Sequence, residues 1–205
     1  MEGPEGMNRF DGVIFDMDGT LVHSPLDFAA MRRELGIADA RQGILEALDA
    51  RPPADRDDGH KRLLEMELAA AAAAEIDPHA TEALDAVRSA GLKTALLTRN
   101  AAPVMEQILG QFPQLQFDLA WSRENGPIKP EPDGVLRACG VLGIAPRRTA
   151  CVGDFYLDMV AARAAGAWGI LLAPGASEAA RRQAHQVIET LAELPAALGI
   201  ATPMA

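Results

Sequence analysis

Two aspartates separated by one residue follow a short apolar run near the start of the chain, in the segment DMDGT (16–20). Side chains two residues apart at the end of a strand point to the same side. Asp16 is expected to be ionised at neutral pH and can act as a nucleophile without an activating base. Asp18 can protonate a leaving oxygen and then deprotonate an attacking water. Gly19 allows a sharp turn that leaves amides free for phosphate oxygens, although a lone motif of this kind is more typical of a solvated turn.

A second pair of carboxylates, Asp154 and Asp158, has the i, i+4 spacing that places both on one face of a helix. Two like charges there are destabilising unless a cation compensates, and Mg²⁺ prefers oxygen ligands, including one or two carboxylates. The alternative is a helix start at which the dipole favours acidic residues. The pair alone leaves both interpretations open.

Lys129 and Thr98 are the other two candidates. Lys129 precedes Pro130, which stiffens the approach to a helix, so the ammonium can span carboxylates and a phosphate oxygen. Thr98 ends an apolar run and can donate to phosphate or cap the next helix. Each residue alone favours the structural role, and only the combination of four segments indicates a site.

The elements that must position these residues alternate between strand and helix. Apolar runs predict strands at 11–16, 92–98, 117–121, 148–153 and 168–173, with helices at about 79–90, 101–111, 132–142 and 156–165. A short edge strand at 186–189 and a short helix at 190–198 follow. This alternation predicts a doubly wound α/β sheet, in which ligands bind beyond the carboxyl ends of the strands. The four candidate segments fall at or near those ends.

Residues 24–77 interrupt the alternation. Helical spacing predicts two helices within 26–50, a polar loop at 51–59, and a helix at 60–76 whose alanine run (69–74) packs closely against a neighbour. We therefore predict a small helical cap at 24–77, inserted into a core domain made of residues 1–23 and 78–205.

Composition limits the partners and the compartment. The net charge is −10, which argues against nucleic acid and anionic membrane surfaces. The N-terminal segment MEGPEGMNRF lacks the features of a signal peptide, and no apolar run reaches the ~18 residues of a membrane span. We expect a cytoplasmic protein whose Cys139 and Cys151 are reduced core thiols.

Four segments, DMDGT (16–20), Thr98, Lys129-Pro130 and GDFYLD (153–158), together resemble the motifs of the haloacid dehalogenase superfamily. The resemblance covers essentially the whole chain and is to phosphoglycolate phosphatase-like members with a small type-1 cap. It implies a Rossmann-like core and makes Asp16 the nucleophile and Asp18 the general acid/base.

The same resemblance implies a Mg²⁺ ion held by Asp16, the backbone carbonyl of Asp18 and Asp154. Asp158 would support the metal site through water or through Lys129. Thr98, Lys129 and Gly19 would bind the phosphoryl group of a small phosphorylated metabolite.

The expected activity is Mg²⁺-dependent hydrolysis of small phosphate monoesters, phosphoglycolate-like or sugar phosphates, through an aspartyl-phosphate. Asp18 argues against carbon–halogen chemistry, because the dehalogenases lack this second aspartate. Lys61, the one lysine of the predicted cap, lies in a polar stretch and argues against a phosphonatase Schiff base. A phosphosugar mutase of the β-phosphoglucomutase type and a non-catalytic phospho-ligand-binding module remain alternatives.

Several features are left open by the sequence. Arg99 follows Thr98 where phosphatases of this kind often have asparagine, and Asn100 comes one residue later. Four charged residues in or directly before the predicted cap can contact a substrate anion, although such residues are usually solvated: His23, Arg32, Arg33 and Arg51. The remaining histidines, His60, His79 and His185, are expected at the surface. The protein is expected to be a monomer or a homodimer.

Overall fold

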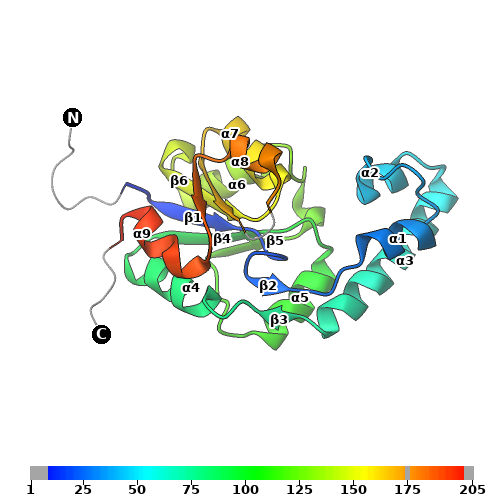
Figure 1. Ribbon diagram of the computed structural model, residues 1–205, viewed down its shortest axis with the longest axis horizontal. Coiled ribbons are helices and arrows are strands. Elements are labelled where there is room, and N and C mark those ends of the chain that lie inside the picture. The colour runs from blue at the N-terminus through cyan, green and yellow to red at the C-terminus, as the bar shows by residue number, and fades with distance from the viewer. Residues whose placement is uncertain (1–8, 174–175, 201–205) are drawn as a thin grey trace.

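A six-stranded parallel sheet forms the centre of the computed structural model, which describes residues 9–173 and 176–200 (Figure 1). The strand order is β5-β4-β1-β6-β7-β8, and all five neighbouring pairs are parallel. The strands are β1 (Gly12–Phe15), β4 (Lys93–Leu97), β5 (Leu119–Trp121), β6 (Thr149–Gly153), β7 (Trp168–Leu172) and β8 (Gln186–Ile188). The first eight residues, which belong to the segment examined for a signal peptide, lie outside the described residues.

Helices cover both faces of the sheet (Figure 1). One apolar cluster joins α4, α5 and α9 to one face, and two others join α6, α7 and α8 to the opposite face. The helices are α4 (Ala80–Ser89), α5 (Ala102–Gln111), α6 (Asp133–Leu142), α7 (Tyr156–Ala165), α8 (Glu178–Gln183) and α9 (Leu194–Leu198). Strands β1 and β6 are buried along their whole length, as in a parallel sheet covered twice. The predicted doubly wound, Rossmann-like α/β fold is confirmed.

The segment 24–77, called the helical insert below, leaves the sheet after β1 and returns before α4. It contains α1 (Phe28–Glu34), α2 (Ile44–Asp49) and α3 (Pro53–Ala72), which extend to one side of the sheet (Figure 1). Its own apolar cluster includes Met31, Leu45, Leu48 and Leu63. Strands β2 (Val22–His23) and β3 (Glu75–Ile76) pair antiparallel at its base. That the insert is a separate cap domain stays a prediction.

The predicted polar loop at 51–59 is wrong, because α3 begins at Pro53. Proline is tolerated in the first helical turn, where its missing N–H has no partner to lose. The following turns of α3 are mostly exposed, so they show no apolar periodicity in the sequence. Gly59 is buried against Leu48, where a Cβ atom would lie only 2.6 Å from the leucine side chain, so a larger residue would require that side chain to shift. The predicted end at residue 76 is also wrong, since α3 ends at Ala72 and Glu75–Ile76 pairs with β2.

The alanine run packs closely against a neighbour, as predicted. Ala70 and Ala71 are buried where α3 crosses α5. The side-chain amides of Gln107 and Gln111 on α5 donate to backbone carbonyls of Leu68 and Ala71. Small side chains allow this approach, which docks the base of the insert onto the core.

Candidate active site

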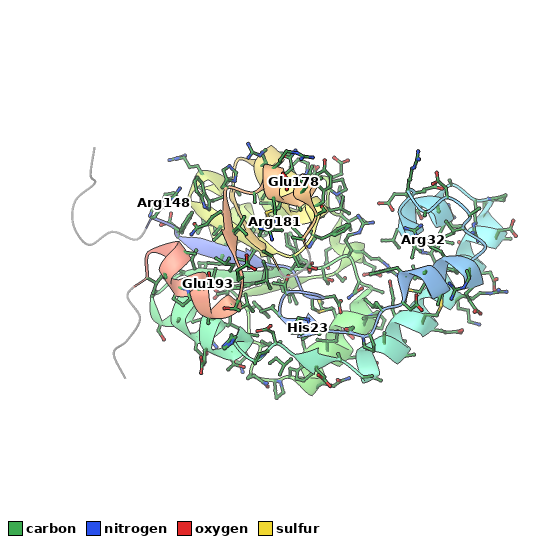
Figure 2. The ribbon with its side chains drawn as sticks, viewed as in Figure 1. His23, Arg32, Arg148, Glu178, Arg181 and Glu193 are labelled. Carbon is green, nitrogen blue, oxygen red and sulfur yellow. The ribbon has the colours of Figure 1, made fainter. Side chains whose placement is uncertain are left out.

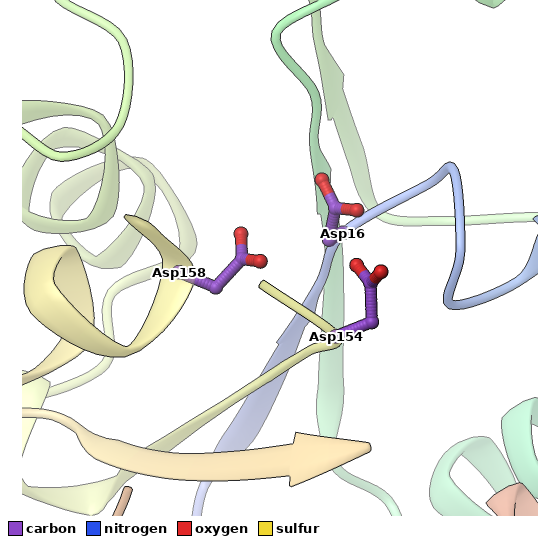
Figure 3. A group of neighbouring side chains, drawn as sticks. All are labelled: Asp16, Asp154 and Asp158. Carbon is purple, nitrogen blue, oxygen red and sulfur yellow. The ribbon is translucent and has the colours of Figure 1, made fainter. Parts of the chain in front are cut away.

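Three carboxylates meet at the carboxyl ends of β1 and β6 (Figure 3). Asp16 follows β1 directly, Asp154 follows β6, and Asp158 lies in the first turn of α7. Oxygens of the three side chains lie within 4.8 Å of one another. The structure therefore brings together the residues that the sequence places at separate strand ends.

Lys129 places its ammonium between two of these carboxylates. Its Nζ donates to Asp16 and, at 2.5 Å, to Asp158. The second oxygen of Asp158 accepts the backbone N–H of Phe155, so this carboxylate is held from two sides. Only 11% of the Lys129 side chain and 13% of the Asp16 side chain are exposed, so this ion pair is largely shielded from water.

Burial, aided by the neighbouring carboxylates, raises the proton affinity of Asp16 and Asp154. Burial raises the pKa of Asp16 to about 8, against the lowering effect of Lys129, and the Asp158 charge adds to the rise. Burial and Asp158 also raise the pKa of Asp154 to about 6. Burial opposes the charge of Lys129, but Asp158 and Asp16 outweigh it and raise its pKa. Lys129 is thus charged, and the expectation of an ionised Asp16 holds only if a further cation shares the site.

A hard divalent cation fits this donor set. The three carboxylates supply only oxygen atoms, which Mg²⁺ and Ca²⁺ prefer, and one lysine leaves an excess of negative charge. Asp158 is already engaged by Lys129 and Phe155, which leaves Asp16 and Asp154 as the freer ligands. The site can therefore hold a divalent ion; the identity of that ion as Mg²⁺ stays a prediction.

Gly19 turns the chain next to these groups. Its φ of +79° lies in the left-handed region, and a Cβ there would collide with the Asp154 carboxylate. Asp18, one residue earlier, is partly buried, and burial raises the pKa of its carboxyl group. A carboxyl group that retains its proton more readily suits a general acid.

Thr98 is buried at the end of β4 and lines a cavity of about 20 Å³ together with Lys129. Its hydroxyl accepts the backbone N–H of Asn100 at 3.1 Å. Asn100 in turn donates its side-chain amide to Asp18. The structure thus links the second predicted segment to the first through Asn100, whose role the sequence left open.

Two arginines of the core reach the helical insert, and the sequence analysis missed both contacts. Arg99 donates to Glu46 on α2 at 2.8 Å and to the backbone carbonyl of Lys129. Arg123, after β5, donates to both oxygens of Glu67 on α3 at 2.8 and 3.0 Å. Two features of the sequence could have indicated the second contact. Arg123 lies two residues beyond the end of β5, and Glu67 lies two residues before the alanine run of α3.

The charged residues of the insert that were considered for substrate contact mostly serve the insert itself. Arg32 lies within the insert and donates to the carbonyls of Asp39 and Gln42 (Figure 2). Arg51 donates to the carbonyl of Leu35. Arg33 is exposed on α1.

The histidines contribute no ligand to the carboxylate cluster. His23 pairs with Asp77 at the base of the insert, and His60 pairs with Asp49. His185 is exposed, as expected, whereas His60 and His79 are only partly exposed.

Two predictions from composition can be compared with the structure. Cys139 and Cys151 are both buried and free. Among the described residues, no helix is long and apolar enough to cross a membrane.

Several known proteins are similar to this chain in sequence. The family model for haloacid dehalogenase-like hydrolases matches residues 10–166. An uncharacterized hydrolase of Saccharomyces cerevisiae is 31% identical over 177 residues, covering 84% of this chain and 81% of the yeast protein. A phosphoglycolate phosphatase of Chromobacterium violaceum is 29% identical over 230 residues, covering 92% and 96% of the two chains.

Solved structures share the fold of this chain. A hydrolase from Pseudomonas syringae superposes with a TM-score of 0.78 at 23% identity, covering 94% of this chain and all of that one. A Deinococcus radiodurans hydrolase of the same family, solved with bound phosphate and sodium, superposes with a TM-score of 0.68 at 26% identity, covering 97% and 100%.

Fold and site define an α/β enzyme with an acidic, lysine-bridged centre at the carboxyl edge of its sheet. The chain belongs to the haloacid dehalogenase-like hydrolases. It is therefore an enzyme, and its reaction is a hydrolysis.

Proposed function

We propose that this protein is a Mg²⁺-dependent phosphatase that hydrolyses small phosphate monoesters through an aspartyl-phosphate on Asp16. The observation that carries the proposal is the cluster of Asp16, Asp154, Asp158 and Lys129 at one sheet edge, where Asp158 is buried and the other three are partly buried. The similarity to relatives such as the Chromobacterium violaceum phosphoglycolate phosphatase supports phosphoglycolate-like esters as substrates, and sugar phosphates are a second substrate group.

In the first step, an Asp16 oxygen attacks phosphorus and the bond from phosphorus to the ester oxygen breaks. Asp18 gives its proton to that oxygen, so the leaving group departs as a neutral alcohol. In the second step, Asp18 takes a proton from water, whose oxygen attacks phosphorus and releases Asp16 and inorganic phosphate. After the second step, Asp16 is again a free carboxylate and Asp18 again carries its proton, so the enzyme has returned to its starting state.

The remaining residues bind and balance charge. Lys129, Thr98 and the backbone around Gly19 would bind the phosphoryl oxygens. Asp16, Asp154 and the backbone carbonyl of Asp18 would hold Mg²⁺, with Asp158 orienting Lys129. The bound ion supplies a positive charge that keeps Asp16 ionised and offsets charge developing on the phosphoryl group. Positioning and charge compensation of this kind dominate phosphoryl transfer.

The test is phosphate release by the purified protein from a panel of phosphomonoesters that includes 2-phosphoglycolate and several sugar phosphates, with Mg²⁺ and with a chelator. We expect release only with the metal and none from the Asp16→Asn variant. Interconversion of sugar phosphate isomers without net release would instead identify a mutase. Ligand binding without any turnover would identify a phospho-ligand-binding module and overturn the proposal.

A further inference from the structure

Asp18 is held by one of its two carboxyl oxygens. Its Oδ2 accepts the side-chain amide of Asn100, while Oδ1 is buried and has no hydrogen-bond partner within the described part of the chain. A buried polar atom without a partner is costly unless a ligand supplies one. Burial raises the pKa of Asp18 and the nearby Ser24 side chain lowers it, but the hydrogen bond that holds the carboxyl group comes from Asn100, which leaves Oδ1 available to a substrate atom.

Asn100 is itself held through its backbone. Its N–H donates to the Thr98 hydroxyl at 3.1 Å, and its carbonyl accepts the N–H of Arg123 at 3.0 Å. The residue therefore cannot move without disturbing two strand ends, those of β4 and β5. This fixed backbone sets the direction in which the Asn100 amide points.

Arg123 continues the chain of contacts into the helical insert. Its guanidinium donates to both oxygens of Glu67 on α3, and it lies 3.7 Å from Glu124. Only 13% of the Arg123 side chain and 9% of the Glu67 side chain are exposed. A buried pair with two hydrogen bonds is far costlier to break than a solvated one.

The second core–insert pair provides a natural contrast. Arg99 and Glu46 also join a strand-end loop to an insert helix, at 2.8 Å, but 48% of the Glu46 side chain is exposed. The Arg99 guanidinium donates to Glu46 and to the Lys129 carbonyl, whereas the Asp18 carboxyl group accepts from Asn100. The two pairs thus share chemistry, but the backbone of Arg123 is hydrogen-bonded to Asn100, whereas Arg99 precedes Asn100 in the chain and directs its guanidinium to the Lys129 carbonyl.

We propose that Asn100 is a positioning residue for the general acid Asp18 and that the buried Glu67–Arg123 pair holds Asn100 in place. Docking of α3 on the core thereby sets the acid that protonates the leaving group. The inference rests on the proposed phosphatase function. It adds a series of contacts, called the relay below, that runs from Glu67 through Arg123 and Asn100 to Asp18.

The test uses two esters that differ in their need for an acid. An alkyl phosphate has a poor leaving group that requires a proton, whereas p-nitrophenyl phosphate releases a stable anion. The ratio kcat/KM reports only the steps up to alcohol release, so it isolates the donation of that proton. We expect Asn100→Ala to lower kcat/KM for the alkyl ester by on the order of 10²-fold and for the aryl ester by only a few-fold.

Glu67→Gln should show the same selective loss to a smaller extent, and Glu46→Gln is its matched control. The double variant Glu67→Gln/Arg123→Gln keeps a neutral, hydrogen-bonding pair if the buried guanidinium alone prevents folding. Equal losses for both esters in Asn100→Ala, or the same selectivity in Glu46→Gln as in Glu67→Gln, would overturn the relay. Failure of the wild type on both esters would instead overturn the phosphatase function itself.

Discussion

The carboxyl edge of the sheet and the helical insert use charged residues in different ways. At the sheet edge, the largely shielded ammonium of Lys129 pairs with both Asp16 and Asp158. In the insert, Arg32 and Arg51 donate to backbone carbonyls of the insert. The edge holds more negative charge than Lys129 alone can balance, whereas these arginines of the insert stabilise the insert itself. This contrast supports a chemical centre in the core, which the insert reaches through Glu46 and Glu67.

The largest expected effect comes from Asp16→Asn, which removes the nucleophile. We expect kcat to fall by on the order of 10⁴-fold or more. The metal-free variant should melt no lower than the wild type, because one crowded carboxyl group is gone. Steady-state kinetics and thermal melting in chelator measure both. Retention of turnover would show that the sheet edge is not the chemical centre.

The Lys129→Met variant tests whether the activity and stability of the sheet edge depend on the Lys129 ammonium group. We expect kcat/KM to fall by about 10²–10³-fold, the size of effect seen when one charge-stabilising donor is removed. The metal-free variant should lose more stability at high pH than at low pH, since protonation relieves the remaining carboxylates. Melting curves across pH provide the measurement, and a pH-independent loss would contradict the charge argument.

Metal and pH should act together on stability. The pKa of Asp16 is about 8 in the folded protein, above the ordinary value of 3.8. A raised pKa contributes stability that is fully present below the unfolded value and is lost as pH rises through the folded one. Mg²⁺ competes with protons for the carboxylates, so its stabilising shift in Tm should be larger at about pH 8.5 than at about pH 5.5.

Differential scanning fluorimetry with Mg²⁺ and with chelator at the two pH values checks this expectation. The Asp154→Asn variant is the informative comparison. It removes a proposed metal ligand, so the increase in Tm caused by Mg²⁺ should be smaller than in the wild type. A shift of equal size at both pH values would argue that the ion binds elsewhere.

The smallest expected effect lies in the insert. Arg51→Met removes the hydrogen bond to Leu35 and should lower the free energy of unfolding by about 1 kcal/mol. The kcat/KM should stay within about threefold, because Arg51 serves the insert and not the site. Urea unfolding and kinetics on the same preparation measure both. A large loss of activity without loss of stability would make Arg51 a substrate contact.

Sequence could predict the sheet because its buried strands are continuous apolar runs, and strand ends carry the polar residues. Val13–Phe15 followed by Asp16 is an example. It could not predict the start of α3, whose exposed first turns have no apolar period. The Arg123–Glu67 contact joins residues 56 positions apart, and no local pattern encodes such a pairing. The raised pKa of Asp16 likewise arises only when the ends of β1 and β6 are brought together and Asp16 is buried there.

The covalent phosphoryl-enzyme intermediate proposed on Asp16 can be trapped chemically. The Asp18→Asn variant turning over p-nitrophenyl phosphate should accumulate the intermediate, because it lacks the base for the second step. Acid quench, borohydride reduction and peptide mass spectrometry should then find homoserine at position 16. Reduction at another carboxylate, or phosphate release by Asp16→Asn at the wild-type rate, would contradict the account.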